Sequence, residues 1–138
     1  MAFEQFVTGT VFRYSYLWRR EQQKGETEGR KERPVTVGVR IEEPNGQDAL
    51  IVLPITSKMP EDGRFASEIP EIEKRRAGLD ATRRLWIILD EYNGDVIGKS
   101  YYLLDQKPLG QLSKSYFLPL VREFIARKKS IRGVDRTR

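Results

Sequence analysis

The first strong pattern in the chain is an alternation of aromatic and polar residues over positions 11–18. The aromatic side chains recur at the period of two that a β-strand imposes, and they are Phe12, Tyr14, Tyr16 and Trp18. Such a stripe either packs in a core or stacks unpaired bases. We expect Phe12 and Tyr14 to be core residues, and the stripe to become exposed toward Trp18.

A β-hairpin is predicted from residues 35–41 and 49–53. Valine and isoleucine alternate with other residues over 35–41, which predicts a half-buried strand. Asn45 and Gly46 favour the positive φ angles of a tight turn. Residues 49–53 are continuously apolar, as in a strand that is buried on both faces. We expect that strand to end at Pro54.

Shorter apolar runs predict three further strands, at residues 65–69, 85–89 and 101–104. Two helical turns are expected over residues 70–77, with Gly78 as the C-terminal stop. After Gly110 the apolar period lengthens to that of an amphipathic helix, which Ser113 or Ser115 would cap. The pattern therefore predicts a C-terminal helix packed on a sheet.

The organisation along the chain favours one domain over residues 1–129, followed by a basic, frayed tail at 130–138. Residues 19–33 contain no large apolar side chain and predict a long exposed loop, of the kind that is usually functional or disordered. Short strands, hairpins and a terminal helix favour a mainly β fold: a small, strongly curved, barrel-like sheet with a C-terminal helix.

Composition narrows the chemistry that this domain can perform. The chain has 138 residues, a net charge of +5, and neither histidine nor cysteine. Imidazole catalysis, thiolate chemistry and the usual zinc sites are therefore excluded, and we expect no metal and no cofactor. The excess of basic residues favours polyanionic partners. Because no apolar segment approaches about 20 residues, we expect a soluble, cytoplasmic protein that does not enter a membrane.

Candidate functional residues lie where the predicted strands begin and end. Arg33 begins one strand, and the hydroxyls of Thr56 and Ser57 follow another, so together they could hold a phosphate without a metal ion. Alternatively, Arg33 pairs with a nearby glutamate, and the two hydroxyls cap local backbone. Residues 90–93 either form a plain turn or add polar contacts to the same groove.

The order of several short motifs resembles the MazF/PemK family of toxins from type II toxin–antitoxin systems. The matching segments are Gly9-Thr10-Val11, Glu28-Gly29, Arg33-Pro34, Pro54-Ile55-Thr56-Ser57, Gly78-Leu79-Asp80 and the run from Arg84 to Asp90. The resemblance extends over most of the chain. It implies an SH3-like barrel of the CcdB/PemK kind, usually a homodimer, that cleaves single-stranded RNA without a metal ion and is neutralised by an antitoxin with an acidic, partly disordered segment.

The resemblance also implies roles for individual residues. Arg33 and Thr56 map to the active site, and charge stabilisation by a guanidinium and by hydroxyl donors suits the phosphorane formed when a ribose 2′-hydroxyl attacks the adjacent phosphate. We add Ser57 to this catalytic set, with Glu28 or Glu21 as the base. The residues expected to contact RNA are Trp18, Arg30, Lys31 and Arg84.

The chain departs from the family pattern at three points. Thr10 stands where the family has an aspartate, no loop histidine is present, and Ile88 stands where some members carry an arginine. An alternative function on the same barrel is therefore a non-catalytic growth inhibitor that binds a protein target, as the CcdB branch does, or a plain nucleic-acid-binding module.

Overall fold

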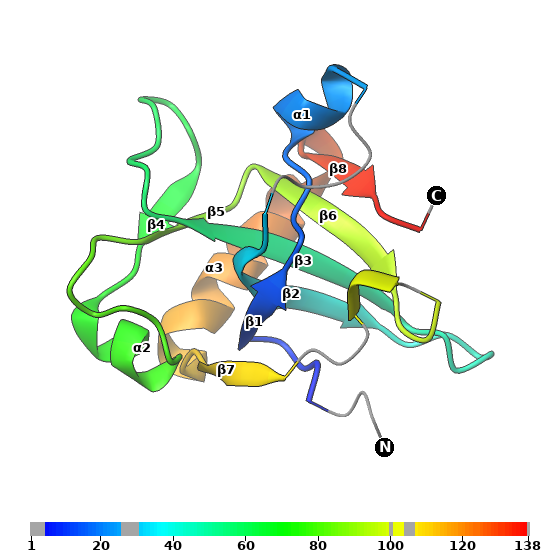
Figure 1. Ribbon diagram of the computed structural model, residues 1–138, viewed down its shortest axis with the longest axis horizontal. Helices are drawn as coiled ribbons and strands as arrows, with labels where there is room; N and C mark the ends of the chain where they lie inside the picture. The colour runs from blue at the N-terminus through cyan, green and yellow to red at the C-terminus, as the bar shows by residue number, and fades with distance from the viewer. Residues whose placement is uncertain (1–4, 26–30, 100, 104–106, 138) are drawn as a thin grey trace.

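The computed structural model describes residues 5–25, 31–99, 101–103 and 107–137. Its centre is an eight-stranded sheet in which β4, β5, β3, β2, β1 and β7 lie side by side in that order, with β6 paired to β3 and β8 paired to β6 (Figure 1). The strands are β1 (Thr10–Tyr14), β2 (Arg33–Ile41), β3 (Ala49–Thr56), β4 (Ala66–Glu68), β5 (Trp86–Ile88), β6 (Glu91–Val96), β7 (Pro108–Gln111) and β8 (Arg132–Asp135). The described strands form an open sheet, because β4 and β7 at the two ends of this order do not pair with each other.

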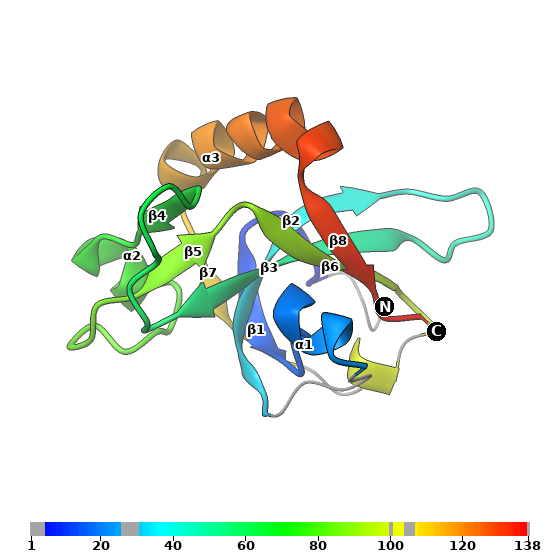
Figure 2. The same cartoon turned by 90° about the horizontal axis from the view of Figure 1, so that it is seen from above.

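Helical segments lie around this sheet. They are α1 (Arg19–Gln23), α2 (Glu71–Arg76), the 3₁₀ turn η1 (Tyr101–Leu103), α3 (Lys114–Arg127) and the 3₁₀ turn η2 (Lys128–Ser130). The longest of them, α3, runs along one face of the sheet (Figure 2). Within the part of the chain that the structure describes, no helix has the length and apolar content needed to cross a membrane.

Each face of the sheet buries its own apolar core. One core joins α3 to the sheet through Phe117, Val121 and Phe124. The other lies on the opposite face and contains the aromatic stripe of the N-terminal segment, including Phe12 and Tyr14. Residues 54 and 56 of β3 continue the face of this second core, whereas residues 53, 55 and 57 continue the first, because side chains alternate along a strand.

The main predictions for the fold are confirmed at the level of a mainly β domain with a C-terminal helix. The predicted hairpin is formed by β2 and β3. Ser113 caps α3, since its hydroxyl accepts a hydrogen bond from the Tyr116 amide. The prediction that β3 ends at Pro54 is wrong, because Pro54 pairs with Val35 and the strand continues to Thr56. Proline removes only one donor from a strand, and its φ angle is compatible with extended backbone.

Three strands, β6, β7 and β8, were not predicted, and one predicted strand is a 3₁₀ turn. Residues 101–103 form η1, and Leu104 lies outside the described residues. Strand β6 shows no alternation of apolar and polar residues, because its buried positions carry Glu91, Asn93 and Asp95. These polar side chains point inward since they bond to the N-terminal segment, as in the 2.6 Å hydrogen bond from Tyr14 to Asp95. Strand β7 is short and contains proline and glycine.

The two segments that we expected to be irregular are partly ordered. In the expected loop 19–33, the first residues form α1, whose Glu21 is buried, and residues 26–30 lie outside the description. The expected frayed tail contains β8, which pairs in parallel with β6. Strand β8 has only four residues and a single buried apolar side chain, Val134, so it carries no alternating apolar signal.

Candidate functional site

Arg33 is the first residue of β2 and Thr56 the last residue of β3, so both lie at one end of these two strands. The pairing of these strands ends with Val35 opposite Pro54. Arg33 precedes that pair on β2 and Thr56 follows it on β3, so both lie at the same end of the hairpin. Arg33 is also the direct partner of Tyr14 on β1. Because opposite residues of antiparallel strands share a face, Arg33 and Thr56 lie on the face that carries the second core.

The Arg33 guanidinium stacks on the ring of Trp18, with 4.9 Å between its central carbon and the ring centroid. Arg20 makes a similar contact at 4.8 Å. Burial lowers the pKa of Arg33 by removing water from its charge, while the Glu21 carboxylate acts in the opposite direction. An arginine nevertheless stays protonated in proteins. Its Nε is buried and has no hydrogen-bond partner among the described residues. The side chain nevertheless lines a hollow on the surface, where an anion could contact it.

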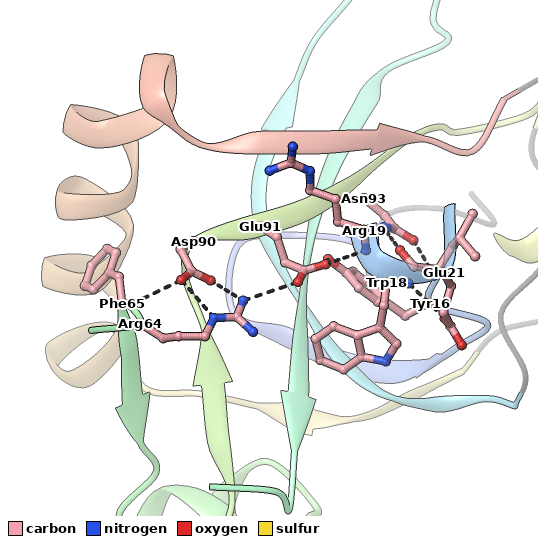
Figure 3. A network of polar contacts seen from close by, with 10 residues as sticks. Tyr16, Trp18, Arg19, Glu21, Arg64, Phe65, Asp90, Glu91 and Asn93 are labelled. Atoms are coloured by element: carbon pink, nitrogen blue, oxygen red, sulfur yellow. Dashed lines mark hydrogen bonds and ion pairs between the residues drawn. The ribbon is translucent and has the colours of Figure 1, made fainter. Parts of the chain in front are cut away.

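Trp18 is buried, which corrects the expectation that the aromatic stripe becomes exposed toward it. A polar network ties the backbone on both sides of Trp18 to strand β6 (Figure 3). Glu91 accepts hydrogen bonds from the Tyr16 hydroxyl at 3.1 Å and from the Arg19 amide at 3.0 Å. The Trp18 amide itself donates to Glu21 at 3.0 Å. The stacking platform for Arg33 is therefore fixed by contacts from a distant strand.

The same network contains Arg64, a residue that sequence reasoning missed. Its guanidinium donates to both carboxylate oxygens of Asp90 and, at 3.3 Å, to Glu91 (Figure 3). These two acids raise the pKa of Arg64. The β4–β5 register pairs Ala66 with Ile88, so its continuation by two residues brings Arg64 opposite Asp90. In the sequence, Arg64 comes directly before the predicted strand 65–69 and Asp90 directly after the predicted strand 85–89. Antiparallel pairing of these two strands would have predicted their contact.

A hollow of about 190 Å³ opens beside Thr56 and Trp18. Its cationic lining residues are Arg20, Lys58 and Arg64. The Thr56 hydroxyl accepts the Lys58 amide at 3.1 Å, as in a capped turn, and keeps its own proton for donation. Among the described residues that line this hollow, Glu61 is the one carboxylate. Cations, a hydroxyl and a carboxylate thus surround one space that is open to solvent.

Ser57 points to the other side of β3 from Thr56, because side chains alternate along the strand. Its hydroxyl accepts a 3.0 Å hydrogen bond from Arg83. It lines a second hollow, of about 450 Å³, together with Arg33 and Lys31. Arg33 lines the second hollow and is linked to the first through Trp18, on which it stacks and which lines the first.

The remaining expected site residues have different surroundings. Arg84 donates two hydrogen bonds to Glu68, at 3.0 and 2.7 Å, and stacks on Trp86. It is not among the described residues that line either hollow. Glu28 and Arg30 lie outside the described residues. Glu21, the alternative base, is buried and accepts the hydrogen bond that begins α1, so its carboxylate already serves the backbone.

The site geometry is suited to holding an anion. It combines a partly desolvated guanidinium, further cations and hydroxyl donors, and charge-assisted hydrogen bonds from such groups are the strong ones. Within the described residues, no group of three or more acidic side chains could hold a metal ion. Comparison of the chain with models of protein families and with curated proteins finds no match.

Proposed function

We propose that this protein is a toxin-like endoribonuclease that cleaves single-stranded RNA without a metal ion and is neutralised by an antitoxin. The observation that carries the proposal is the Arg33 guanidinium, which stacks on Trp18 and lines a solvent-accessible hollow at the same end of the β2–β3 hairpin as Thr56. A stacked guanidinium has a fixed plane and strong, charge-assisted donors. A phosphate oxygen in the hollow that Arg33 lines could accept a hydrogen bond from it.

The proposed reaction is an internal transesterification. The ribose 2′-oxygen attacks the adjacent phosphorus and loses its proton to a base, while the bond from phosphorus to the 5′-oxygen breaks and that oxygen takes up a proton. The products are a 2′,3′-cyclic phosphate and a free 5′-hydroxyl. Arg33 and the Thr56 hydroxyl would stabilise the charge that develops on the phosphorane oxygens. Thr56 lines the first hollow and Arg33 the second, and Arg33 stacks on Trp18, which lines the first.

Two carboxylates are candidates for the base. Glu61 lines the same hollow as Thr56, and Glu28 remains a candidate from the sequence. Replacement of each by glutamine removes the proton acceptor and keeps the shape of the side chain. We expect one of these variants to lose cleavage at neutral pH, and a general base contributes about 10²- to 10⁴-fold.

The partners follow from the charge of the site. The second hollow is lined by four cations, Arg13, Lys31, Arg33 and Arg83, and by the carboxylates Glu32 and Asp80. The excess of positive charge attracts either an RNA backbone or an acidic peptide. We propose that the antitoxin covers these cations with its acidic segment and that the protein acts as a homodimer in the cytoplasm. RNA and antitoxin would then compete, and both would dissociate as the salt concentration rises.

The proposal is tested by incubating the purified protein with a mixture of single-stranded RNAs in excess EDTA. Fragments that carry cyclic phosphate and 5′-hydroxyl ends are expected. Activity that appears only after magnesium is added would contradict the proposal. Tight RNA binding without cleavage, or binding of a protein target alone, would instead favour the non-catalytic growth inhibitor or the plain nucleic-acid-binding module.

A further inference from the structure

Arg136 is buried although it lies close to the end of the chain, with a relative exposure of 4%. Its guanidinium carbon lies 3.9 Å from the centroid of the Tyr102 ring and 5.7 Å from that of Tyr14. Its backbone amide donates to the Gly94 carbonyl at 2.8 Å. The C-terminal segment therefore inserts a cation into the core that carries the aromatic stripe.

The Arg136 guanidinium contacts the turn that precedes Trp18. Its Nη1 donates to the Ser15 carbonyl and, at 3.2 Å, to the Asn93 side chain. Asn93 in turn clamps Leu17, accepting its amide at 2.9 Å and donating to its carbonyl at 2.8 Å. Arg136 thus holds this turn at two points, directly at Ser15 and through Asn93 at Leu17.

Strand β8 holds Arg136 at this depth. It pairs in parallel with β6 from Arg132 to Asp135. Gly133 lies directly against the ring of Tyr92, where an added Cβ would be 2.2 Å from a ring carbon. The close approach that glycine permits therefore seats the strand, and Arg136 follows it into the core.

Stability alone does not account for an arginine at this position. Burial of a guanidinium carries a large desolvation cost, and Nη2 of Arg136 has no partner among the described residues. An apolar side chain would pack against Tyr102 without that cost. It could not, however, donate to the Ser15 carbonyl or to Asn93, so the groups that hold the turn before Trp18 would lose a partner.

We propose that Arg136 is a positioning residue for the pair formed by Arg33 and Trp18. It fixes the turn at residues 15–17, which sets the place of the Trp18 ring and hence of the guanidinium that stacks on it. The catalytic consequence rests on the function proposed above, whereas the effect on the turn does not. Docking of β8 thereby completes a site whose other residues come from the opposite end of the chain.

The test compares Arg136→Met, Arg136→Lys and the control Lys129→Met. Methionine keeps the apolar packing against Tyr102, lysine keeps one donor, and the control removes the same charge from an exposed position. Amide exchange is measured at Leu17 and at Val52 in the central strand β3. Cleavage of single-stranded RNA is measured in EDTA as separate kcat and KM values.

In Arg136→Met we expect exchange at Leu17 to accelerate on the order of 10-fold or more while exchange at Val52 is unchanged. The kcat should fall by about 10-fold, with KM within about threefold, because a misplaced guanidinium weakens the transition state more than the ground state. Arg136→Lys should recover part of both losses, and Lys129→Met should resemble the wild type.

Unchanged exchange at Leu17 in a folded Arg136→Met protein would overturn the proposal. Equal loss of protection at Leu17 and Val52 would overturn it too, because Arg136 would then serve the fold as a whole. If exchange at Leu17 accelerates in a protein whose wild type does not cleave RNA, the positioning role stands and the ribonuclease function fails.

Discussion

The guanidinium carbon of Arg33 lies 4.9 Å from the centroid of the Trp18 ring, so the first residue of β2 is stacked on the residue that precedes α1. This contact joins the sheet to a segment that Glu91 holds in place. Stacking fixes the plane of a guanidinium and leaves its edge free to donate hydrogen bonds. The geometry of the proposed site therefore depends on Trp18 as much as on Arg33.

Replacement of Trp18 by leucine should lower kcat/KM for RNA cleavage by about 10-fold, because a cation–π contact of a partly desolvated pair is lost. Trp18→Phe keeps an aromatic face, so its kcat/KM should lie between those of the wild type and Trp18→Leu. The matched control is Trp86→Leu, which removes the ring under Arg84. It should lower stability without an equal loss of cleavage, and equal losses in both variants would argue against a specific role of Trp18.

Replacement of Arg64 by alanine should destabilise the fold by about 2–4 kcal/mol, because it leaves the buried Glu91 carboxylate without its cation. Urea unfolding of the two proteins measures the difference. The control is Arg75→Ala, which breaks an exposed pair with Glu71 on α2 and should cost no more than about 0.5 kcal/mol. Similar costs in both variants would show that the Arg64 network is an ordinary surface contact.

Stability should fall steeply at alkaline pH. Burial, and then the neighbouring acids Asp95 and Glu91, raise the pKa values of Tyr14 and Tyr16 well above the ordinary tyrosine value. Above about pH 10 the unfolded chain loses these protons while the native state retains them, so the free energy of unfolding decreases as pH rises. Below that pH the contribution is fully present.

The measurement for this alkaline effect is urea unfolding at a series of pH values, with tyrosinate absorbance recorded in parallel. In Tyr16→Phe one of the raised groups is gone, so the slope of stability against pH should decrease by about one proton. An identical slope in the variant would show that Tyr16 ionises as freely in the native state as in the unfolded chain.

Replacement of Arg84 by alanine should leave cleavage within about threefold of the wild type, because two of its donors already bind Glu68. This differs from the role that the sequence suggested for Arg84. Cleavage by the variant and the wild type is compared at low and at moderate salt. A difference due only to the net charge should shrink as salt rises, whereas the loss of a direct phosphate contact should persist. A loss comparable to that of an active-site variant would place Arg84 in the RNA groove after all.

The placement of Arg33 and Thr56 near one end of a hairpin was accessible from the sequence, because the apolar runs at 35–41 and 49–53 lie next to them. The register of the hairpin was not accessible, because Ile41 pairs with Ala49 across residues 42–48 and a bulge lies between Val37 and Val39. The helix after Ser113 was accessible, since its period and its cap agree. Local sequence patterns suffice to predict an element where its contacts are close in sequence or where its buried face is apolar.

Strand β6 and the burial of Trp18 were not accessible in this way. The inward side chains of β6 are acids and an amide, and they become favourable inside the protein only through partners such as Tyr14 and Tyr16. Arg136 is a similar case, because its contacts join the two ends of the chain. Binary patterns report apolar faces, so a buried polar network between distant segments leaves no periodic signal.

Single-turnover cleavage by Arg33→Ala tests the central claim most directly. The reaction is run with saturating protein in EDTA on one single-stranded RNA, beside the wild type and Arg122→Ala, which removes an exposed arginine from α3. If Arg33 stabilises the transition-state charge, its loss should slow cleavage on the order of 10²-fold or more, with Tm nearly unchanged and Arg122→Ala close to wild type. A folded Arg33→Ala protein that cleaves within a few-fold of the wild type would contradict the account.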